Sequence, residues 1–200
     1  MALSKERIVI EALTLLNESS LEGVTLRKIA KRLDVYASAL YWHFNNKEAL
    51  VNEMAEVILR EGFKHFQAID ENEAWQDWLI DFFNTLRQTL LAYSDGVKVV
   101  TSSQLSENMA KLSEMAIQTL YDNNVSLHTS RLTVVTAMRY TFGYVSEEQM
   151  EVSDKLLKEF DVDTFNQNHP LTAQAVQEYF NANKNIDTLF MDGLKLIIKE

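Results

Sequence analysis

Apolar residues near the start of the chain follow the spacing of short helices. One helical face, with positions i, i+3, i+4 and i+7, is formed by Leu26, Ile29, Ala30 and Leu33. Thr25 precedes this run and is a residue type that caps helix N-termini. Asp34 ends the run, and residues 37–44 make a second segment only two turns long. Two short helices joined by a tight turn are the form of a helix-turn-helix, whose second helix enters the DNA major groove.

The same periodicity predicts helices along most of the remaining chain. We expect them over residues 5–19, 47–66, 75–90, 107–121, 127–148, 172–181 and 186–198. Residues 149–170 are polar and irregular, and we expect a loop there. Because the chain has one proline, five glycines and few turn-type dipeptides, the expected fold class is all-α.

A polar break at residues 70–73 divides the chain into two regions. We expect residues 1–47 to be a three-helix DNA-binding domain of the helix-turn-helix type. A connecting helix over residues 47–66, which Asn46 can cap, would follow it. Residues 67–200 would form a second helical domain. Its many large apolar side chains suit a small-molecule pocket, although an aromatic stripe at helical spacing also suits an ordinary core.

Groups that can contact DNA phosphates are concentrated in the helix-turn-helix. They are Thr25, Arg27, Lys28, Tyr41, His43 and Lys47. Trp42 belongs to a run of four consecutive aromatic residues, which is more than a structural two-turn helix needs. Short amphipathic helices joined by turns also occur in other all-helical proteins, so the spacing alone leaves a purely structural alternative open.

The net charge of −10 is unusual for a protein expected to bind DNA. Residues 1–50 contain seven Lys or Arg and six Asp or Glu, a net charge of +1, which leaves −11 for the other 150 residues. The acidic excess therefore lies in the second region, where it would keep that region away from DNA. Weak overall attraction also limits non-specific binding, which is mostly electrostatic.

Other function classes find little support in the sequence. The chain has no cysteine, and its four histidines are scattered without metal-ligand spacing, so no metal or cofactor is expected. Gly-rich phosphate loops and nucleophile motifs are absent from the sequence, which argues against an enzyme. The sequence has no apolar signal stretch at its N-terminus and no run of ~20 apolar residues, so a soluble cytoplasmic protein with no membrane partner is expected.

Several stretches resemble the tetracycline-repressor (TetR) family of bacterial transcription regulators. Three stretches within residues 23–50 resemble the DNA-binding signature of that family: GVTLRKIAKRLDV, LYWHF and NNKEAL. Three later stretches resemble landmarks of its ligand domain: WQDW (75–78), SDGVKV (94–99) and FGYVSEEQ (142–149). The resemblance covers nearly the whole chain, most specifically up to Lys47. It implies a DNA-binding domain followed by a helical domain for ligand binding and dimerisation.

The resemblance also assigns a homodimer interface to residues 127–148 and 186–198, where two helices from each subunit would form a four-helix bundle. Within the second of these, Gly193 lies in mid-helix at a cost of ~1 kcal/mol relative to Ala, which indicates close approach of another helix. A core helix inside one subunit is the alternative. A dimer would match two half-sites one DNA turn apart, about 34–36 Å.

The side chains on the expected base-reading surface are small. The recognition helix presents Ala37, Ser38 and Ala39, whose methyl groups can meet thymine methyls but form few hydrogen bonds. Arg27 is the best candidate for a bidentate contact with guanine. We expect Tyr41, Trp42, His43 and Lys47 to position the helix on phosphates.

The candidate effector pocket differs from that of the tetracycline-binding members of the family. By the resemblance, Phe63 and Phe82 stand at positions of a His and an Asn that bind the drug, Leu86 replaces an aromatic residue and Ala116 replaces a Gln. Val100 stands where a His ligates magnesium, Ser103 keeps a hydroxyl near the place of a Thr, and Glu147 matches. The candidate effector residues are Phe63, Phe82, Leu86, Val100, Ser103, Ala116, Met138 and Glu147. Because valine cannot ligate a hard cation, we expect an apolar or amphipathic effector instead of magnesium-tetracycline.

The expected function is a ligand-responsive DNA-binding transcriptional regulator: a homodimeric repressor that its effector releases from a palindromic operator. The alternative is a helical small-molecule-binding or interaction protein that does not use DNA. An enzyme of the all-helical type is a third hypothesis. Substitution of Arg27 and Lys47 separates the first two, because DNA affinity and its salt dependence should fall only for a DNA-binding protein.

Overall fold

The computed structural model describes residues 3–103, 106–150, 158–182 and 185–199 of the chain. Within these ranges the regular structure is helical and no strand occurs, so the all-α prediction is confirmed. None of the helices among the described residues is long and apolar enough to cross a membrane.

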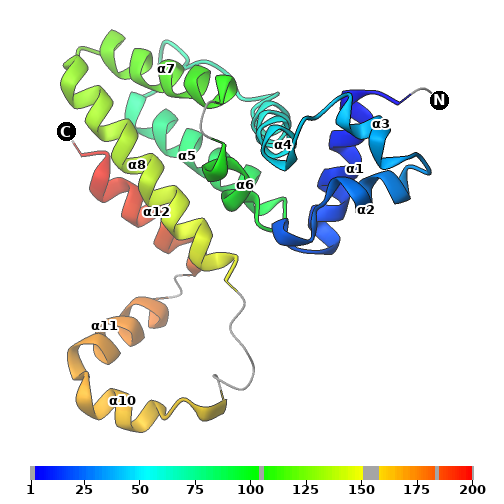
Figure 1. Ribbon diagram of the computed structural model, residues 1–200. Coiled ribbons are helices and arrows are strands. Elements are labelled where there is room, and N and C mark those ends of the chain that lie inside the picture. The colour runs from blue at the N-terminus through cyan, green and yellow to red at the C-terminus, as the bar shows by residue number, and fades with distance from the viewer. Residues whose placement is uncertain (1–2, 104–105, 151–157, 183–184, 200) are drawn as a thin grey trace.

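An N-terminal head is built from three α-helices and one short 3-10 helix. They are α1 (Lys5–Glu18), η1 (Leu21–Gly23), α2 (Leu26–Arg32) and α3 (Ala37–Tyr41). The side chain of Thr25 caps α2 as predicted, because its Oγ1 accepts a hydrogen bond from the backbone N–H of Lys28 at 3.2 Å. Asn46 likewise caps α4 (Lys47–Gly62), the helix that leads from the head into the rest of the molecule (Figure 1).

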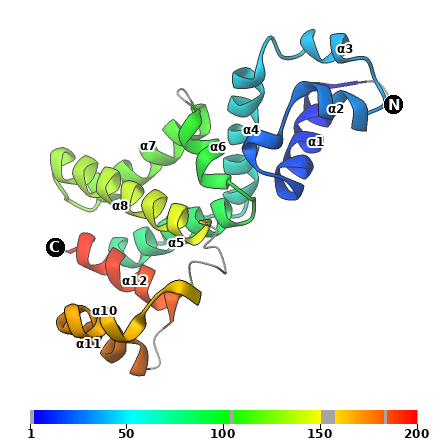
Figure 2. The same ribbon diagram turned by 60° about the horizontal axis from the view of Figure 1, so that its bottom comes forward.

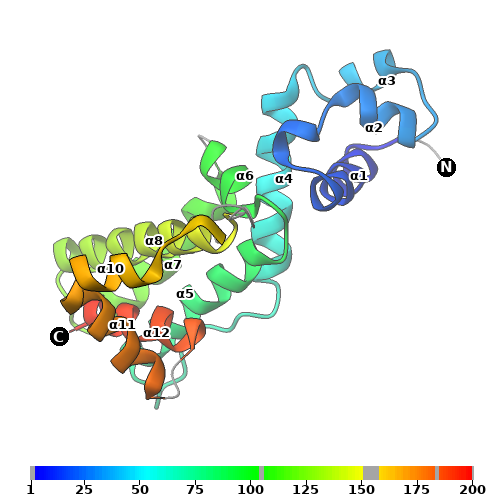
Figure 3. The same cartoon turned by 90° about the horizontal axis from the view of Figure 1, so that it is seen from below.

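The body consists of the helices that pack around α5. They are α5 (Trp75–Leu91), α6 (Gly96–Ser102), α7 (Glu107–Asp122), α8 (Leu127–Glu148) and α12 (Ile186–Ile197). In Figures 1 and 2, α8 and α12 lie side by side. Two further helices, α10 (Val162–Asn168) and α11 (Pro170–Asn181), form a lobe apart from the body, and neither contains a buried residue. Figure 3 shows this lobe with α12 at one end of the molecule and the head at the other.

Aromatic rings join the end of α4 to α5. The ring centroid of Phe63 lies 5.0 Å from that of Phe82, and the centroid of Phe66 lies 5.4 Å from that of Trp78. Phe82 and Trp78 are themselves 5.5 Å apart and almost completely buried. The buried apolar residues continue from this cluster into both head and body as one core. Close packing of this kind resists separation of α4 from α5.

Two glycines allow close approach of neighbouring segments. A Cβ added to Gly62, the last residue of α4, would lie 2.2 Å from the side chain of Thr89 on α5. A Cβ added to Gly96 would lie 2.1 Å from the carbonyl oxygen of Leu90, against which the start of α6 folds. Any larger residue would therefore push α4 or α6 away from α5.

The helix predictions are correct for most elements, but two helices were not predicted and one ends earlier than expected. The loop expected over residues 149–170 is wrong at 162–168, where α10 is capped by Asp161 through the backbone N–H of Thr164. Residues 151–157 of that expected loop lie outside the described residues. The connecting helix ends at Gly62, four residues earlier than expected. Residues 96–102 form α6, which periodicity did not indicate because it is only seven residues long.

The close approach predicted at Gly193 is confirmed, and the neighbour is α8 of the same chain. A Cβ at Gly193 would lie 2.1 Å from the hydroxyl oxygen of Tyr140. That hydroxyl donates to the carbonyl oxygen of Phe190 at 3.2 Å. The hydroxyl of Tyr144 donates to the carbonyl oxygen of Ile186 at 2.7 Å. Two tyrosines of α8 therefore hold the backbone of α12.

Candidate nucleic-acid interface

The second helix of the helix-turn-helix, α3, is anchored by two buried residues. Leu40 of α3 and Phe44 just after it lie in the core with Ile29 of α2. Asp34 adopts a left-handed conformation, with φ of 54°, and the backbone N–H of Val35 donates to the carbonyl oxygen of Ala30 at 3.0 Å. This tight turn fixes α3 against α2. The residues of α3 that do not face the core are consequently presented outward.

A group of aromatic residues stands in solvent around α3. Trp42 is 90% exposed, Tyr36 is 87% exposed and half of Tyr41 is accessible. Large apolar side chains that remain exposed in a small domain indicate a binding surface. Tyr36 was missed in the sequence, because it precedes α3 and lies outside the helical periodicity. Its position at the N-cap of α3, which only the structure shows, places it outside the core.

The expected DNA-contacting residues divide into exposed and structurally engaged groups. Arg27, Lys28 and Ser38 are exposed, whereas Ala37 and His43 are partly buried. Thr25 uses its side-chain oxygen to cap α2. Lys47 donates from Nζ to the carbonyl oxygen of Leu21 at 2.6 Å. An ammonium group has three donors, so this bond leaves Lys47 with two more for other acceptors.

One cation of α2 is occupied inside the head. The guanidinium of Arg32 donates to Glu11 and Glu18 of α1, and its Nη2 lies 2.9 Å from an oxygen of Glu18. The hydrogen bond with Arg32 is the main reason that the pKa of Glu18 lies below its ordinary value. The arrangement fixes α2 on α1. Arg27 and Lys28, at the N-terminal end of α2, remain exposed.

Hydrogen bonds connect the head to the turn between α5 and α6. The carboxylate of Asp95 accepts from the backbone N–H of Leu21 at 2.8 Å, and Asn17 accepts from the backbone N–H of Ser94 at 2.9 Å. The side chain of Gln149 donates to the carbonyl oxygens of Leu90 and Tyr93, at 3.1 and 2.7 Å. The turn is thus held by the head on one side and by the C-terminal end of α8 on the other.

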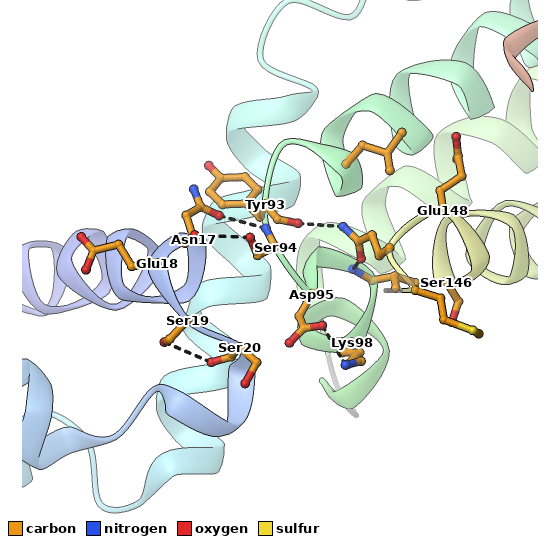
Figure 4. A pocket seen from close by; sticks show the side chains of 14 residues that line it. Asn17, Glu18, Ser19, Ser20, Tyr93, Ser94, Asp95, Lys98, Ser146 and Glu148 are labelled. Carbon is orange, nitrogen blue, oxygen red and sulfur yellow. Dashed lines mark hydrogen bonds and ion pairs between the residues drawn. The ribbon is translucent and has the colours of Figure 1, made fainter. Parts of the chain in front are cut away.

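A cleft of about 820 Å³ opens at this junction. Figure 4 shows Asn17, Ser19 and Ser20 of the head on one side of it, and Asp95 and Lys98 of the body on the other. Its lining mixes hydroxyl, amide and charged groups with a few apolar ones. Asp95 and Lys98 form an ion pair with 2.7 Å between Oδ1 and Nζ, so the charges of the body side are already matched.

A second connection joins α4 to α7. Glu56 Oε2 accepts from the backbone N–H of Asn108 at 3.0 Å, and the side-chain amide of Asn108 donates to the carbonyl oxygen of Glu56 at 3.1 Å. The other carboxylate oxygen of Glu56 is buried without a hydrogen-bond partner among the described residues. A displacement of α7 would therefore move α4 and, through it, the head.

Most candidate effector residues lie in the packed interior of the body. Phe82, Leu86, Val100 and Ala116 are buried, and Phe63, Ser103 and Met138 are partly buried. They come from the mutually packed helices α5 to α8 or directly follow α4 and α6, and within the set the rings of Phe63 and Phe82 lie 5.0 Å apart. Glu147 is separate from them, because it is exposed on α8. None of the eight lines either of the two clefts described for this structure.

A network of ion pairs that joins α5, α8 and α12 was not predicted from the sequence. Arg87 of α5 is 2% exposed, and its guanidinium donates to Glu148 of α8 and, at 2.8 Å, to Asp187 of α12. Its carbon Cζ lies 5.0 Å from the centre of the Phe190 ring. The hydrogen bond with Glu148 is the main cause that raises the pKa of Arg87 above its ordinary value. Three helices of the body are therefore joined by one buried cation.

No group of three or more His, Cys, Asp or Glu residues that could hold a metal ion occurs in the described part of the chain. The position matched to the magnesium-binding His is Val100, which is buried.

Two family models match the sequence. Residues 8–54 match the model described as bacterial regulatory proteins, tetR family. Residues 69–199 match the model described as Tetracyclin repressor-like, C-terminal domain. The first match covers most of the head and the first half of α4, and the second covers the body.

Known proteins with similar sequences and structures agree with these matches. The tetracycline repressor protein class A from transposon 1721 of Escherichia coli is 32% identical over 196 residues, covering 98% of this chain and 89% of that protein. The crystal structure of TetR from Acinetobacter baumannii AYE is similar with a TM-score of 0.76 and 29% identity, covering 98% and 95% of the two chains. BioQ with its double-stranded DNA operator is similar with a TM-score of 0.67 and 25% identity, covering 96% and 98%.

Proposed function

Because the chain belongs to the TetR family of bacterial regulatory proteins, we propose that it is a homodimeric repressor whose small apolar or amphipathic effector releases it from a palindromic DNA operator. TetR-family regulators are DNA-binding proteins and not enzymes. The observation that carries the proposal is the outward surface of α2 and α3 in the region matched to the family's DNA-binding domain. BioQ, a similar protein, has been crystallised with its operator.

Operator binding would use both direct and backbone contacts. Arg27 and Lys28 are exposed on α2, while Ser38, Tyr41 and Trp42 are exposed on or next to α3. A recognition helix with a short polar residue and small neighbours fits deep into the major groove, and the surrounding aromatic and cationic groups suit phosphates. Tyr36 adds a further hydroxyl at the N-terminal end of that helix.

Uncovered apolar side chains on α8 and α12 support the homodimer. Leu132 is 57% exposed on α8, and Leu196 is 68% exposed on α12. Gly143 of α8 has open space where a Cβ would be, which permits close approach of a second subunit. Leu171 and Phe180 of α11 are also exposed, on a lobe whose two helices contain no buried residue. A second copy would cover these surfaces.

The effector would enter the body among α5, α6, α7 and α8. Phe82, Leu86, Val100 and Ala116 supply an apolar environment with few polar groups, which suits an apolar or amphipathic molecule. Because these residues are packed together, binding requires the body to open. A molecule that binds the opened body more tightly than the closed one would shift the population toward the opened form. The contact of Glu56 with Asn108 offers a path from α7 to α4 and the head.

Selection of bound DNA from a random duplex library, followed by affinity measurements against salt, tests the proposal. We expect a palindromic site with half-sites one helical turn apart and a steep decrease of affinity with salt. No enriched sequence at low salt, with effector absent, would contradict operator binding by the free protein. A titration with magnesium and tetracycline tests the effector class, and we expect no saturable binding. Tight binding of that complex would contradict an effector of different chemistry.

A further inference from the structure

We propose that the groove between α1 and α4 binds an organic cation with an apolar body. The α1–α4 groove is defined by Ile10 and Leu13 on α1, Val57 on α4, the carboxylates of Glu6 and Glu61 at its rim, and Tyr93 at its end. None of the candidate effector residues lines it. It is therefore a second site, separate from the body interior.

The groove has the size and floor of a small-molecule site. Its volume is about 590 Å³, within the ~300–1,000 Å³ that such sites occupy. Ile10 is 56% exposed, and it is the exposed large apolar residue of the described head that does not belong to the aromatic group around α3. Leu13 is buried beside it, and Val57 closes the floor from α4. An aliphatic or aromatic group that covered Ile10 would remove apolar surface from water.

The charges around the groove select a cation. Its lining contains the carboxylates of Glu6, Glu18 and Glu61 and one guanidinium, Arg60. Because Glu18 is already paired with Arg32, a net charge of −1 remains. Glu61 lies 3.2 Å from Arg60 and 4.0 Å from Lys64, and both pairs are exposed and therefore weak. A ligand ammonium could approach Glu61 with little competition. Anionic molecules, including DNA phosphates, would be repelled.

Tyr93 provides a third element of recognition. Burial raises the pKa of Tyr93, and the negative charge of Glu61 raises it further, so this carboxylate acts electrostatically on the end of the groove. The face of an aromatic ring attracts an organic cation within about 6 Å of its centre. The apolar residues Ile10, Leu13 and Val57, the carboxylates of Glu6 and Glu61, and the ring of Tyr93 together match an amphipathic cation.

The position of the groove gives such a ligand a regulatory role. One wall belongs to the head and the other to the connecting helix α4, while Tyr93 immediately precedes the turn whose Ser94 donates to Asn17. A molecule that contacts both walls binds most tightly to one orientation of the head relative to α4. It would therefore shift the orientations available to the head. This consequence rests on the proposed operator function, whereas binding in the groove does not.

Methyl NMR of the full chain with labelled Ile, Leu and Val tests the site. The probes are three molecules with the same apolar body, phenylbutylammonium, phenylbutanol and phenylpentanoate. We expect the ammonium to give saturable shifts at the methyl groups of Ile10, Leu13 and Val57. The alcohol should bind about fivefold more weakly and the carboxylate more weakly still, because one carboxylate–ammonium contact and one cation–π contact are lost.

Two variants and a control separate this groove from other surfaces. Ile10→Ser and Glu61→Gln change exposed residues, so both should fold, and each should weaken binding of the ammonium about threefold to tenfold. Glu114→Gln, which changes an exposed carboxylate of α7 outside the groove, should leave it unchanged. Equal affinity for the three probes would overturn the proposal. So would shifts confined to methyl groups of the body, no saturable shift, or binding that Ile10→Ser and Glu61→Gln leave intact.

A separate measurement addresses regulation. Operator affinity should change with saturating phenylbutylammonium in the unaltered protein and in Glu114→Gln, and the change should be reduced in Ile10→Ser. If no operator is found, the NMR titration still decides whether the groove binds a cation. If an operator is found but its affinity does not respond while the groove is saturated, the regulatory part is overturned and the binding site stands.

Discussion

Asp95 of the body accepts a hydrogen bond from the backbone N–H of Leu21, with 2.8 Å between nitrogen and Oδ2. The carbonyl oxygen of the same Leu21 accepts from Lys47 Nζ at 2.6 Å. The segment between α1 and α2 is therefore held by the body and by α4 through a single residue. Any rotation of the head relative to the body has to break one of these bonds or move both partners with it.

Substitution of Asp95 should weaken the attachment of the head. Asp95 has φ of 53°, a conformation that Asn tolerates and Ala does not favour. Asp95→Asn can keep an oxygen acceptor for Leu21, whereas Asp95→Ala loses the acceptor and adds strain. We expect Asp95→Ala to lower the free energy of unfolding by about 1–3 kcal/mol and Asp95→Asn by clearly less, as measured with urea. Equal losses in the two variants would contradict this explanation.

The same carboxylate should make stability depend on pH in the acid range. Burial acts to raise the pKa of Asp95, but hydrogen bonds from Lys98 and Leu21 outweigh it and hold the pKa below its ordinary value. A lowered pKa in the folded state contributes stability above the unfolded value of about 3.9, and this contribution is lost as the pH falls through the folded value. The stability difference between the unaltered protein and Asp95→Asn should therefore shrink below about pH 4. A difference that stays constant from neutral to acid pH would rule out this role.

Removal of the cation at Arg87 should destabilise the body. Arg87→Met leaves the partly buried carboxylate of Glu148 without its partner, and the loss from breaking such a buried pair is about 3–5 kcal/mol. Asp187→Asn is the matched control, because the Asp187 side chain is 65% exposed and its contact should contribute less than about 1 kcal/mol. Urea unfolding compares the two. A larger loss of unfolding free energy for Asp187→Asn than for Arg87→Met would contradict the assignment of Glu148 as the more important partner of Arg87.

Two neighbouring cations of α2 should affect operator binding differently. Arg27→Ala should cost about 1–3 kcal/mol and relax specificity at one base pair, if the guanidinium contacts guanine. Lys28→Ala should weaken all sequences similarly and reduce the slope of log affinity against log salt by about one. Lys111→Ala, on α7 far from the head along the chain, serves as the control. Identical salt slopes for Lys28→Ala and Lys111→Ala would remove Lys28 from the phosphate-contacting set.

The dimer can be tested at two exposed leucines. Leu132→Glu on α8 and Leu196→Glu on α12 place a charge on surfaces that are open in the single chain, so folding should be retained. We expect monomers by light scattering and a loss of operator affinity of about 100-fold or more, because the second half-site is no longer engaged by a linked head. Ile10→Ser, on the head, should remain dimeric. Dimers in both leucine variants would place the interface elsewhere.

The elements whose periodicity is long and amphipathic could be predicted from the sequence. α5, α7 and α8 begin at or within one residue of the expected positions, because wide apolar stripes and capping residues such as Ser126 mark them. α10 escaped prediction because it is seven residues long and its apolar residues, Val162 and Phe165, form only a single i, i+3 pair. α6 is too short for a periodic signal.

Parts of the candidate site depend on tertiary contacts that no local pattern contains. The partners of Arg87 are 61 and 100 residues away along the chain, and those of Leu21 are 74 and 26 residues away. Lys47 was identified as a cation for phosphates, but its bond with Leu21 could only be seen after the head had folded. The exposure of Tyr36 could not be predicted either, because the sequence alone does not distinguish an exposed tyrosine from a core residue.

Trp42 and Trp78 differ so much in their surroundings that they form two natural optical reporters. Trp42 stands in water beside α3, whereas Trp78 is buried against Phe66 and Phe82 and donates from its indole nitrogen to the carbonyl oxygen of Gln67 at 3.1 Å. A soluble quencher should reach the first indole freely and the second hardly at all. With the third tryptophan, the partly buried Trp75, replaced by Phe, unlabelled protein could thus report separately, by fluorescence, on events at α3 and on opening of its interior.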